Sequence, residues 1–324
     1  MQNMITRTEI SPGKAPFTIE KDSSVITIGS CFADMIGDRM KHYRMNVSAN
    51  PFGTCYNPIS IFQLLTISIE RKYNPLPAEL GGVWYDHQFH SELSALSPEE
   101  LHQLTNEKIA ETYSKLKSAS ILIITFGTAW AYRHVNSNSI VNNCHKQAGK
   151  YFKKELISIK HILEEFETLY KELKQLNPSL KIILTVSPVR HIKDTLPLNS
   201  VSKANLISAS YYICEQLDDC YYFPAYELQV DDLRDYRYYS EDLIHPSSLA
   251  QEYIWNKLTN WAFSPLLHDI MKEWDHLHRL LQHKAFHPTS VAHQEFLIQT
   301  INRFNQFDYW DVSEEINTLK AQLI

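Results

Sequence analysis

The chain has 324 residues, 44% of them hydrophobic and 21% charged, a composition typical of a globular protein with at least one substantial core. Its formal net charge of −6 argues against a nucleic-acid partner, which would need clustered lysine and arginine on a basic surface. The five cysteines are an odd number, lie far apart and include no C-x-x-C pair. Neither a disulfide framework nor a zinc knuckle is therefore predicted.

The amino-terminal stretch, residues 1–24, carries charges and prolines where a signal peptide would have an apolar run of about 7–15 residues. The longest apolar stretch, residues 121–124, is far shorter than the roughly 20 residues needed to span a bilayer. We therefore expect a cytoplasmic protein without a membrane span.

Short apolar runs alternate with amphipathic stretches along most of the chain. The run from Val25 to Ile28 predicts a strand that ends at Gly29, and apolar residues then recur at helical spacing. Such alternation indicates a parallel sheet covered by helices on both faces, an α/β fold. Further strands are expected over 121–126, 182–186 and 220–223, and helices over about 156–173 and 203–216.

Two regions depart from the alternation. Residues 60–118 contain helix-like and polar segments and are interpreted as an insertion or cap. Beyond Pro265 the pattern is wholly helical, with a last helix expected to begin near Ser313. We therefore expect an α/β domain over residues 1–264 and a C-terminal helical extension over 265–324.

Ser30 directly follows the first predicted strand and precedes a helix. Backbone amides of the first helical turn would point toward its hydroxyl and could stabilise the oxyanion of an acyl-transfer reaction. The same position suits a serine that only caps the helix. Cys31 is a rival nucleophile, since a thiol at a helix N-terminus can have a lowered pKa, although free cysteine is usually buried.

Asp242 stands three residues before His245, so that one turn or a compact loop brings carboxylate and imidazole to one side. A serine needs a base to take its proton, and a histidine serves best when a carboxylate fixes its tautomer. Ser248 and Gln251 resemble a capping box, which places the pair in a loop that enters a helix. Asp242 could also be a simple surface charge.

The pentapeptide from Gly29 to Ala33, GSCFA, is the sequence that names the GSCFA domain family, and the chain resembles that family from about Val25 to Trp255. The family is similar to SGNH and GDSL hydrolases, whose fold is a flavodoxin-like three-layer parallel sheet. The resemblance implies that Ser30 is the nucleophile, His245 the general base and then acid, and Asp242 the orienting carboxylate. Other matching blocks lie at 50–54, 125–130, 143–146, 187–190 and 233–247.

The same resemblance gives Gly53 the position of the oxyanion-hole glycine, beside the amide of Ser30 or Cys31. The third SGNH block, G-x-N-D, would place its asparagine at position 129, where this chain has Ala129. Asn143 and Thr128 are the candidates to replace it, although a structural turn around 142–143 is an equal alternative. The substrate pocket is expected to include Cys31, Thr128, Trp130, His145 and Arg190.

Neither a cofactor nor a metal is expected. Asp86, His87 and His90 invite a zinc hypothesis, but H-x-x-H supplies only two of the three or four ligands that zinc needs. Arg190, Arg234 and Arg237 could hold an anionic group of the substrate. Arg234 and Arg237 are instead expected to pair with the aspartates at 231, 232 and 235.

The expected activity is hydrolysis of an acyl ester, with an acetyl ester as the first choice, through an acyl-Ser30 intermediate. The substrate would be a small molecule or a carbohydrate ester. Two alternatives remain open, an O-acyltransferase that acts on a glycan and a non-catalytic glycan- or acyl-binding protein, because fold does not fix function. The C-terminal helices could in addition serve an interaction.

Overall fold

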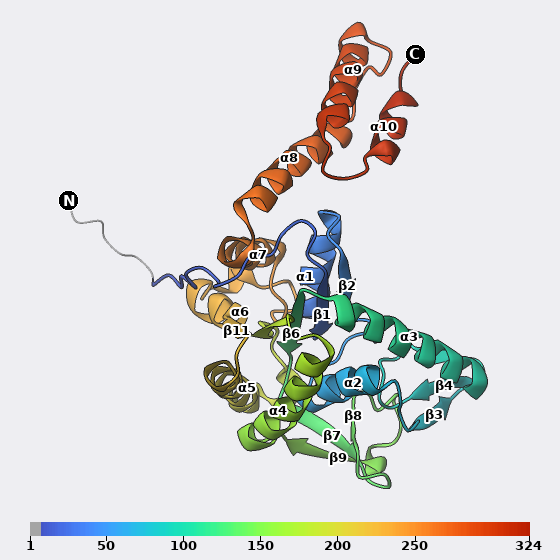
Figure 1. Ribbon diagram of the computed structural model, residues 1–324, viewed down its shortest axis with the longest axis vertical. Helices are drawn as coiled ribbons and strands as arrows, with labels where there is room; N and C mark the ends of the chain where they lie inside the picture. Colours follow the sequence, from blue (N-terminus) through green and yellow to red (C-terminus); the bar gives the residue numbers. More distant parts are fainter. Residues whose placement is uncertain (1–7) are drawn as a thin grey trace, which may run out of the picture.

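The computed structural model describes residues 8–324, so that residues 1–7 of the amino-terminal stretch lie outside the described part. Its centre is a five-stranded, all-parallel sheet with strand order β2-β1-β6-β10-β11 (Figure 1). Counted along the chain this order is 2-1-3-4-5, the flavodoxin-like doubly wound order, and it confirms the predicted α/β fold. The strands are β1 (Val25–Gly29), β2 (Val47–Ala49), β6 (Ile121–Phe126), β10 (Lys181–Val186) and β11 (Cys220–Phe223).

Helices cover both faces of the sheet because successive strand residues point to opposite sides. Ile26, Ile28 and Leu122 belong to one buried cluster, whereas Val25 and Ile121 belong to the other. The first cluster is covered by α2 (Pro58–Glu70), α3 (Pro98–Ser118), α4 (Ile159–Leu176) and α5 (Leu196–Gln216), and the second by α1 (Cys31–His42) and α7 (Ser248–Ala262).

The stretch 60–118 is therefore only partly an insertion. Apolar residues of α2 and α3, among them Phe62 and Leu116, pack into the main core under the sheet. Outside that layer lies a small antiparallel sheet of β3 (Pro77–Leu80), β4 (Val83–Asp86) and β5 (Ser94–Ala95).

A second small antiparallel sheet follows β6. It consists of β7 (Trp130–His134), β8 (Ile140–Val141) and β9 (Phe152–Leu156). The helix expected from 156 starts later because Leu156 still pairs with Trp130 in this sheet. The helix expected from 203 starts earlier, at Leu196, because Thr195 caps it and a proline occupies its first turn.

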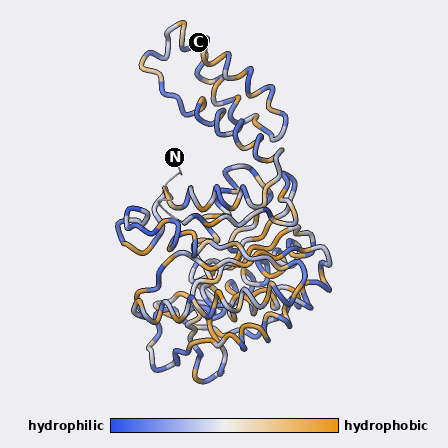
Figure 2. Tube along the Cα trace, turned by 90° about the vertical axis from the view of Figure 1, so that its left-hand side faces the viewer, coloured by the Kyte–Doolittle hydropathy of each residue, from blue (hydrophilic) through white to orange (hydrophobic). Residues whose placement is uncertain are grey.

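The C-terminal extension consists of α8 (Pro265–Leu281), α9 (Val291–Gln306) and α10 (Ser313–Lys320). It projects from the α/β body in both views (Figures 1 and 2). Near its base, Trp274 Nε1 donates to the carbonyl of His42 at 2.9 Å and the Tyr43 hydroxyl donates to Asp275 at 3.2 Å.

Short helical turns complete the description. They lie at Ala225–Glu227, at Leu228–Asp232, where the turn is π-helical, and at Gly149–Tyr151, Ile192–Asp194 and Tyr236–Tyr238. No helix within residues 8–324 is both long and apolar enough to cross a membrane.

Candidate functional site

The candidate site lies at the carboxyl ends of β1 and β6, where the strand order of the sheet reverses and open α/β sheets bind their ligands. The two strands pair as far as Gly29 and Thr125. Gly29 has φ +139°, and a Cβ there would lie 2.1 Å from the carbonyl oxygen of Thr125. Only glycine fits this position, so that the chain can turn directly from β1 into α1.

Ser30 is the N-cap of α1, and its Oγ accepts a hydrogen bond from the amide of Phe32 at 3.3 Å. Its side chain is 1% exposed. The expected helix cap is therefore present. A hydroxyl that accepts one hydrogen bond still has its own proton to donate, so the cap is compatible with a nucleophilic role.

The loop after β2 holds the turn at Gly29 in place. Asn50 Oδ1 accepts from the Gly29 amide at 2.8 Å, and its Nδ2 donates to Asp34 at 2.6 Å. The amide of Cys55 donates to the Gly29 carbonyl at 2.8 Å. Asn50 thus links the end of β1 to α1. The sequence showed Asn50 only as the first residue of a family block.

The thiol of Cys31 is a poor candidate for a thiolate. Burial raises its pKa, and the nearby carboxylate of Asp34 raises it further. A thiol of this kind is mainly protonated near neutral pH and is a weak nucleophile. The lowered thiol pKa that would make Cys31 a rival nucleophile is therefore not found at this helix start.

Asp242 and His245 form a hydrogen-bonded pair. His245 Nδ1 lies 2.6 Å from Asp242 Oδ2, and Asp242 Oδ1 accepts from the amides of His245 and Ile244 at 3.0 and 2.9 Å. These contacts lower the pKa of Asp242 to about 2, the amide of His245 most of all and its side chain next. Leu243 adopts a left-handed φ of +59°, which curls the loop around the carboxylate.

Among residues 8–324, neither Asp242 nor His245 makes a hydrogen bond with Ser30. The side chains of His245 and Asp242 are 49% and 45% exposed, whereas Ser30 is buried. Within residues 8–324, no hydrogen bond joins Ser30 to His245. The catalytic roles of these three residues stay predictions.

The His245 loop is anchored to the end of β10. The Arg190 amide lies 3.4 Å from the carbonyl of Ile244, and its guanidinium donates to the Tyr239 hydroxyl at 2.7 Å. The guanidinium also lies 4.3 Å from the centroid of the Tyr239 ring. Arg190 therefore positions this loop. The expected pairing of Arg234 is confirmed, since it binds Asp231 at 2.6 Å.

The helix after His245 begins one residue earlier than the expected capping box implied. Ser247, not Ser248, is the N-cap of α7, and its hydroxyl accepts from the Ala250 amide at 3.3 Å. Gln251 donates instead to the carbonyl of Pro246 at 3.1 Å. These contacts fix the loop that carries His245.

Three of the predicted oxyanion donors, those of Ser30, Gly53 and Asn143, already donate to another acceptor. The Ser30 amide donates to the backbone carbonyl of Thr125 at 3.1 Å, and the Gly53 amide donates to the backbone carbonyl of Asn50 at 2.8 Å. The Asn143 side-chain amide donates to Ser91 at 3.2 Å. By contrast, the Cys31 amide donates to no other residue within the described range, which makes it the open donor beside Ser30.

The loop after β6 is fastened to α5. Thr128 Oγ1 lies 3.0 Å from Ser202 Oγ and accepts from the Trp130 amide at 3.1 Å. The amide of Ala129 donates to the same Ser202 oxygen at 2.7 Å, and Ala129 is wholly buried. Trp130 Nε1 reaches the carbonyl of Leu198 at 3.4 Å. Thr128 and Trp130 therefore hold this loop against the start of α5.

The run around Asn143 packs against the 77–95 segment. The amides of Asn142 and Asn143 both donate to the His87 carbonyl. His145 Nε2 bonds the carbonyl of Asp86 at 2.9 Å and its Nδ1 bonds Ser91 at 3.2 Å. Burial lowers the pKa of His145 to about 4. These contacts favour the structural-turn interpretation and do not reach Ser30 or His245.

The histidine-rich segment lacks the arrangement that a metal requires. Among residues 8–324, no group of three or more histidine, cysteine, aspartate or glutamate side chains is arranged to hold a metal ion. His87 Nδ1 instead bonds the carbonyl of Asn143 at 2.8 Å.

Two residues near the site were missed by sequence reasoning. Lys203 on α5 is 1% exposed, and its Nζ donates at 2.7 Å to the carbonyls of Gly127 and Ser187. His191 packs edge-on against the Tyr56 ring, with centroids 5.6 Å apart, and burial lowers its pKa to about 4. His191 directly follows the 187–190 block, but no local pattern marks Lys203.

A groove begins beside Ser30 and runs between α1, α7 and α8. Its volume is about 750 Å³. Carboxylates outnumber the basic groups that line it. The lining includes Cys31, Asp34, Asp38, Arg39, His42, Glu252 and Asp275.

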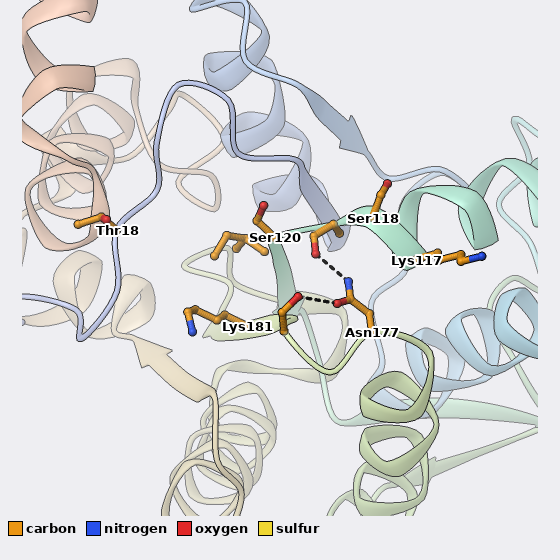
Figure 3. Close-up of a pocket in the computed structure, with 9 residues that line it drawn as sticks. Thr18, Lys117, Ser118, Ser120, Asn177 and Lys181 are labelled. Carbon is orange, nitrogen blue, oxygen red and sulfur yellow. Dashed lines mark hydrogen bonds between the residues drawn. The ribbon is translucent and has the colours of Figure 1, made fainter.

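A separate cavity of about 390 Å³ lies at the opposite edge of the sheet, near the first residues of β6 and β10 (Figure 3). The buried polar side chain in it, Asn177, donates to the carbonyls of Leu116 and Ala119 and accepts from Ser179. The polar atoms of the Asn177 side chain are thus already hydrogen-bonded within the protein.

Comparison with known proteins gives a family match across most of the chain. The model of the GSCFA family matches residues 24–258, and that of the GSCFA domain protein, C-terminal domain, matches residues 274–324. A search of curated proteins found no match.

Several solved structures are similar at low identity. A carbohydrate esterase family 3 protein from Talaromyces cellulolyticus is 8% identical, with 77% of this chain and 99% of that chain covered and a TM-score of 0.35. A putative GDSL-like lipase from Parabacteroides merdae is 15% identical (76% and 98% covered, TM-score 0.36). A Clostridium thermocellum family 3 carbohydrate esterase is 9% identical (78% and 98%, TM-score 0.31). The family match, which spans more than half of the sequence, shows that this chain belongs to the GSCFA family.

Proposed function

We propose that this protein is a serine esterase that cleaves an acyl ester through an acyl-Ser30 intermediate. The observation that carries the proposal is the Asp242–His245 pair at 2.6 Å, in a loop tied to the sheet edge at which Ser30 begins α1. Asp242 accepts the Nδ1 proton and so leaves Nε2 of His245 as the base.

The reaction would proceed in two acyl transfers. His245 Nε2 takes the Ser30 hydroxyl proton while Ser30 Oγ attacks the ester carbonyl, and the amide of Cys31 donates to the resulting oxyanion. Collapse breaks the ester bond, and His245 returns the proton to the departing alcohol. Water, deprotonated by His245, then releases the acid and restores Ser30.

The burial of the site supports a small acyl group on a large alcohol. Ser30 is 1% exposed, so a small acyl group such as acetyl would meet less obstruction at its oxygen than a long chain would. His245 is about half exposed, so the alcohol would lie toward solvent. The adjoining groove carries more carboxylates than cations, which suits the hydroxyl groups of a neutral sugar and disfavours an anion. We therefore propose an acetylated carbohydrate as the substrate.

The test compares Ser30→Ala with Ser264→Ala. Ser264 is likewise a buried N-cap, of α8, at 5% exposure, so its loss controls for the missing cap. We expect Ser30→Ala to abolish turnover of a small acetyl ester and labelling by a fluorophosphonate, and Ser264→Ala to retain both. Equal turnover and labelling in the two variants would refute the serine mechanism.

Transfer to a sugar hydroxyl would use the same acyl-Ser30 intermediate. With an acetyl donor and a sugar acceptor present together, the ratio of free acetate to acetylated sugar distinguishes an esterase from an O-acyltransferase. A rise in acetylated sugar with acceptor concentration, at constant donor consumption, would identify the transferase.

A second candidate is a non-catalytic protein that binds glycans or acyl groups. It is favoured by the hydrogen bonds that already engage the Ser30 and Gly53 amides, and by the absence, within the described residues, of a hydrogen bond between Ser30 and His245. Saturable glycan binding that survives His245→Ala, with no cleavage of any acetyl ester tested, would establish it.

A further inference from the structure

Lys203 is a wholly buried lysine at the edge of the sheet where Ser30 lies. Gly127 and Ser187, whose carbonyls it binds at 2.7 Å, each stand just beyond the end of a central strand, β6 and β10. These strands pair in register with each other, and β6 pairs with β1 as far as Gly29. The Lys203 Nζ therefore sits across the two strand ends next to the start of α1.

The contacts of Lys203 fasten several parts of the site at once. Through Gly127 it reaches the loop after β2, because the Gly127 amide donates to the carbonyl of Tyr56 at 2.8 Å. Its neighbour Ser202 accepts from the Ala129 amide in the same β6 loop. One turn of α5 thus fixes the backbone at the carboxyl ends of β1 and β6, where the strand order of the sheet reverses.

The charge of Lys203 also acts on the start of α1. The ammonium lowers the pKa of the Cys31 thiol, although burial and Asp34 raise it on balance. Burial in turn lowers the pKa of Lys203 to about 7. A buried cation is expensive unless it is paired or bonded. Two carbonyls occupy only two of the three N–H groups of an ammonium.

We propose that Lys203 is a positioning residue for acyl transfer, which holds the β6 and β10 loops and directs a buried positive charge at the oxyanion that forms beside Ser30 and Cys31. This inference rests on the proposed esterase function. When Lys203 is protonated, its charge is in place before the reaction begins, so that it stabilises negative charge in the transition state without reorganisation.

The first test is Lys203→Met, which keeps the length of the side chain and removes its charge and its donors. The matched control is Lys174→Met, since Lys174 also donates to two backbone carbonyls, Pro178 and Leu180, at the opposite edge of the sheet. We expect Lys203→Met to lower kcat for acetyl-ester cleavage by about 10- to 100-fold with KM changed less than about twofold. Wild-type kcat in a folded Lys203→Met protein would overturn the proposal.

A second variant separates charge from packing and serves if Lys203→Met does not fold. Lys203→Ala leaves a space that n-propylamine, as its ammonium ion, matches atom for atom, whereas 1-propanol has the same shape without charge. We expect propylamine to raise kcat of Lys203→Ala at least about tenfold more than propanol does. Equal rescue by both compounds would show that Lys203 acts through packing only, and would refute a catalytic contribution from its charge.

A third measurement does not depend on esterase activity. The rate of Cys31 alkylation by iodoacetamide, followed by peptide mass mapping at pH 6–7, reports the thiolate fraction of Cys31 while Lys203 still carries its proton. We expect alkylation to be slower in Lys203→Met than in the wild type and unchanged in Lys174→Met. If the wild type shows no turnover and no fluorophosphonate labelling, the proposed function fails, yet this difference in alkylation rate still tests the charge of Lys203. Equal alkylation rates in Lys203→Met and in the wild type would refute the inference about Lys203, whatever the outcome for the esterase function.

Discussion

Nδ1 of His245 and Oδ2 of Asp242 lie 2.6 Å apart, and the other oxygen of the same carboxylate accepts from the backbone amide of His245. One aspartate therefore orients both the ring and the peptide of the histidine that follows it by three residues. This double contact forms within a single loop and does not depend on substrate. It engages Nδ1 of the ring and leaves Nε2 for the role of base that we propose.

Asp242→Asn tests the value of that orientation. Asparagine keeps the shape but can offer an N–H to Nδ1, which favours the wrong tautomer. We expect kcat for acetyl-ester cleavage to fall by about 10²- to 10⁴-fold with little change in KM. Asp231→Asn is the control, since Asp231 is similarly exposed and pairs with Arg234 three residues away. Equal losses in both variants would contradict the role of Asp242.

Acid should destabilise the protein through His145 and His191. Burial lowers both pKa values to about 4, from an ordinary value of about 6.5. Between these values the unfolded chain binds protons that the folded protein does not, so stability is lost as pH falls from about 6.5 to 4. Urea midpoints measured across this range should therefore decrease.

The matching variants are His145→Gln and His191→Gln, compared with His161→Gln on the exposed start of α4. His145→Gln and His191→Gln should each make the fall of the urea midpoint with decreasing pH less steep. His161→Gln should leave that fall unchanged. A curve for His145→Gln parallel to that of the wild type from pH 6.5 to 4 would contradict burial as the cause.

The sequence predicts the strands that are short apolar runs between turn residues. β1, β6, β10 and β11 are of this kind, and all four were expected in place. By contrast, β2 has three half-buried residues at the sheet edge, and β9 reads FKKEL, so neither carries a clear strand pattern. Their pairing depends on neighbours that are distant in sequence, which no local pattern reveals.

The residues of the candidate site also fall into those that local sequence reveals and those that depend on tertiary contacts. Asp242 and His245 are close in sequence, and their pairing follows from their spacing. Asn50 and Lys203 act through hydrogen bonds to backbone groups of distant strands, and such contacts exist only once the sheet has formed. The exposure of His245 and the burial of Ser30 likewise follow from tertiary packing and could not be read from their motifs.

Gly29→Ala should displace the backbone at the end of β1, directly before Ser30. A Cβ there would meet the backbone carbonyl of Thr125 at 2.1 Å, and φ +139° is strained for any other residue. Because the obstacle is backbone within the central sheet, it cannot rotate away. We expect a loss of at least about 2 kcal/mol in the free energy of unfolding.

Gly13→Ala is the control for Gly29→Ala. Gly13 also has a positive φ, +76°, but no atom lies within 4 Å of an added Cβ. It therefore measures the cost of an alanine at a positive φ without a steric contact. Urea unfolding of both variants measures the difference, and equal losses would mean that the approach of β1 to β6 is looser than described.

The burial of Lys203 predicts a stability that rises with pH. Its pKa is lowered to about 7 by burial, whereas an exposed lysine in the unfolded chain titrates near about 10.4. Between these values the unfolded chain binds one proton more than the folded protein, so the free energy of unfolding should increase by up to about 1.4 kcal/mol per pH unit from this residue. The titratable groups around Lys203 are Cys31 on α1 and His191 in the β10 loop, which interact with its charge, and Tyr226, whose ring centroid lies 5.6 Å from Nζ. All three are present in Lys203→Met as in the wild type.

Lys203→Met should lose this rise of stability between pH 7 and 9, while Lys174→Met should keep it. Urea unfolding of the three proteins at several pH values measures the slopes, and the same slope in Lys203→Met as in the wild type would show that Lys203 keeps its proton throughout.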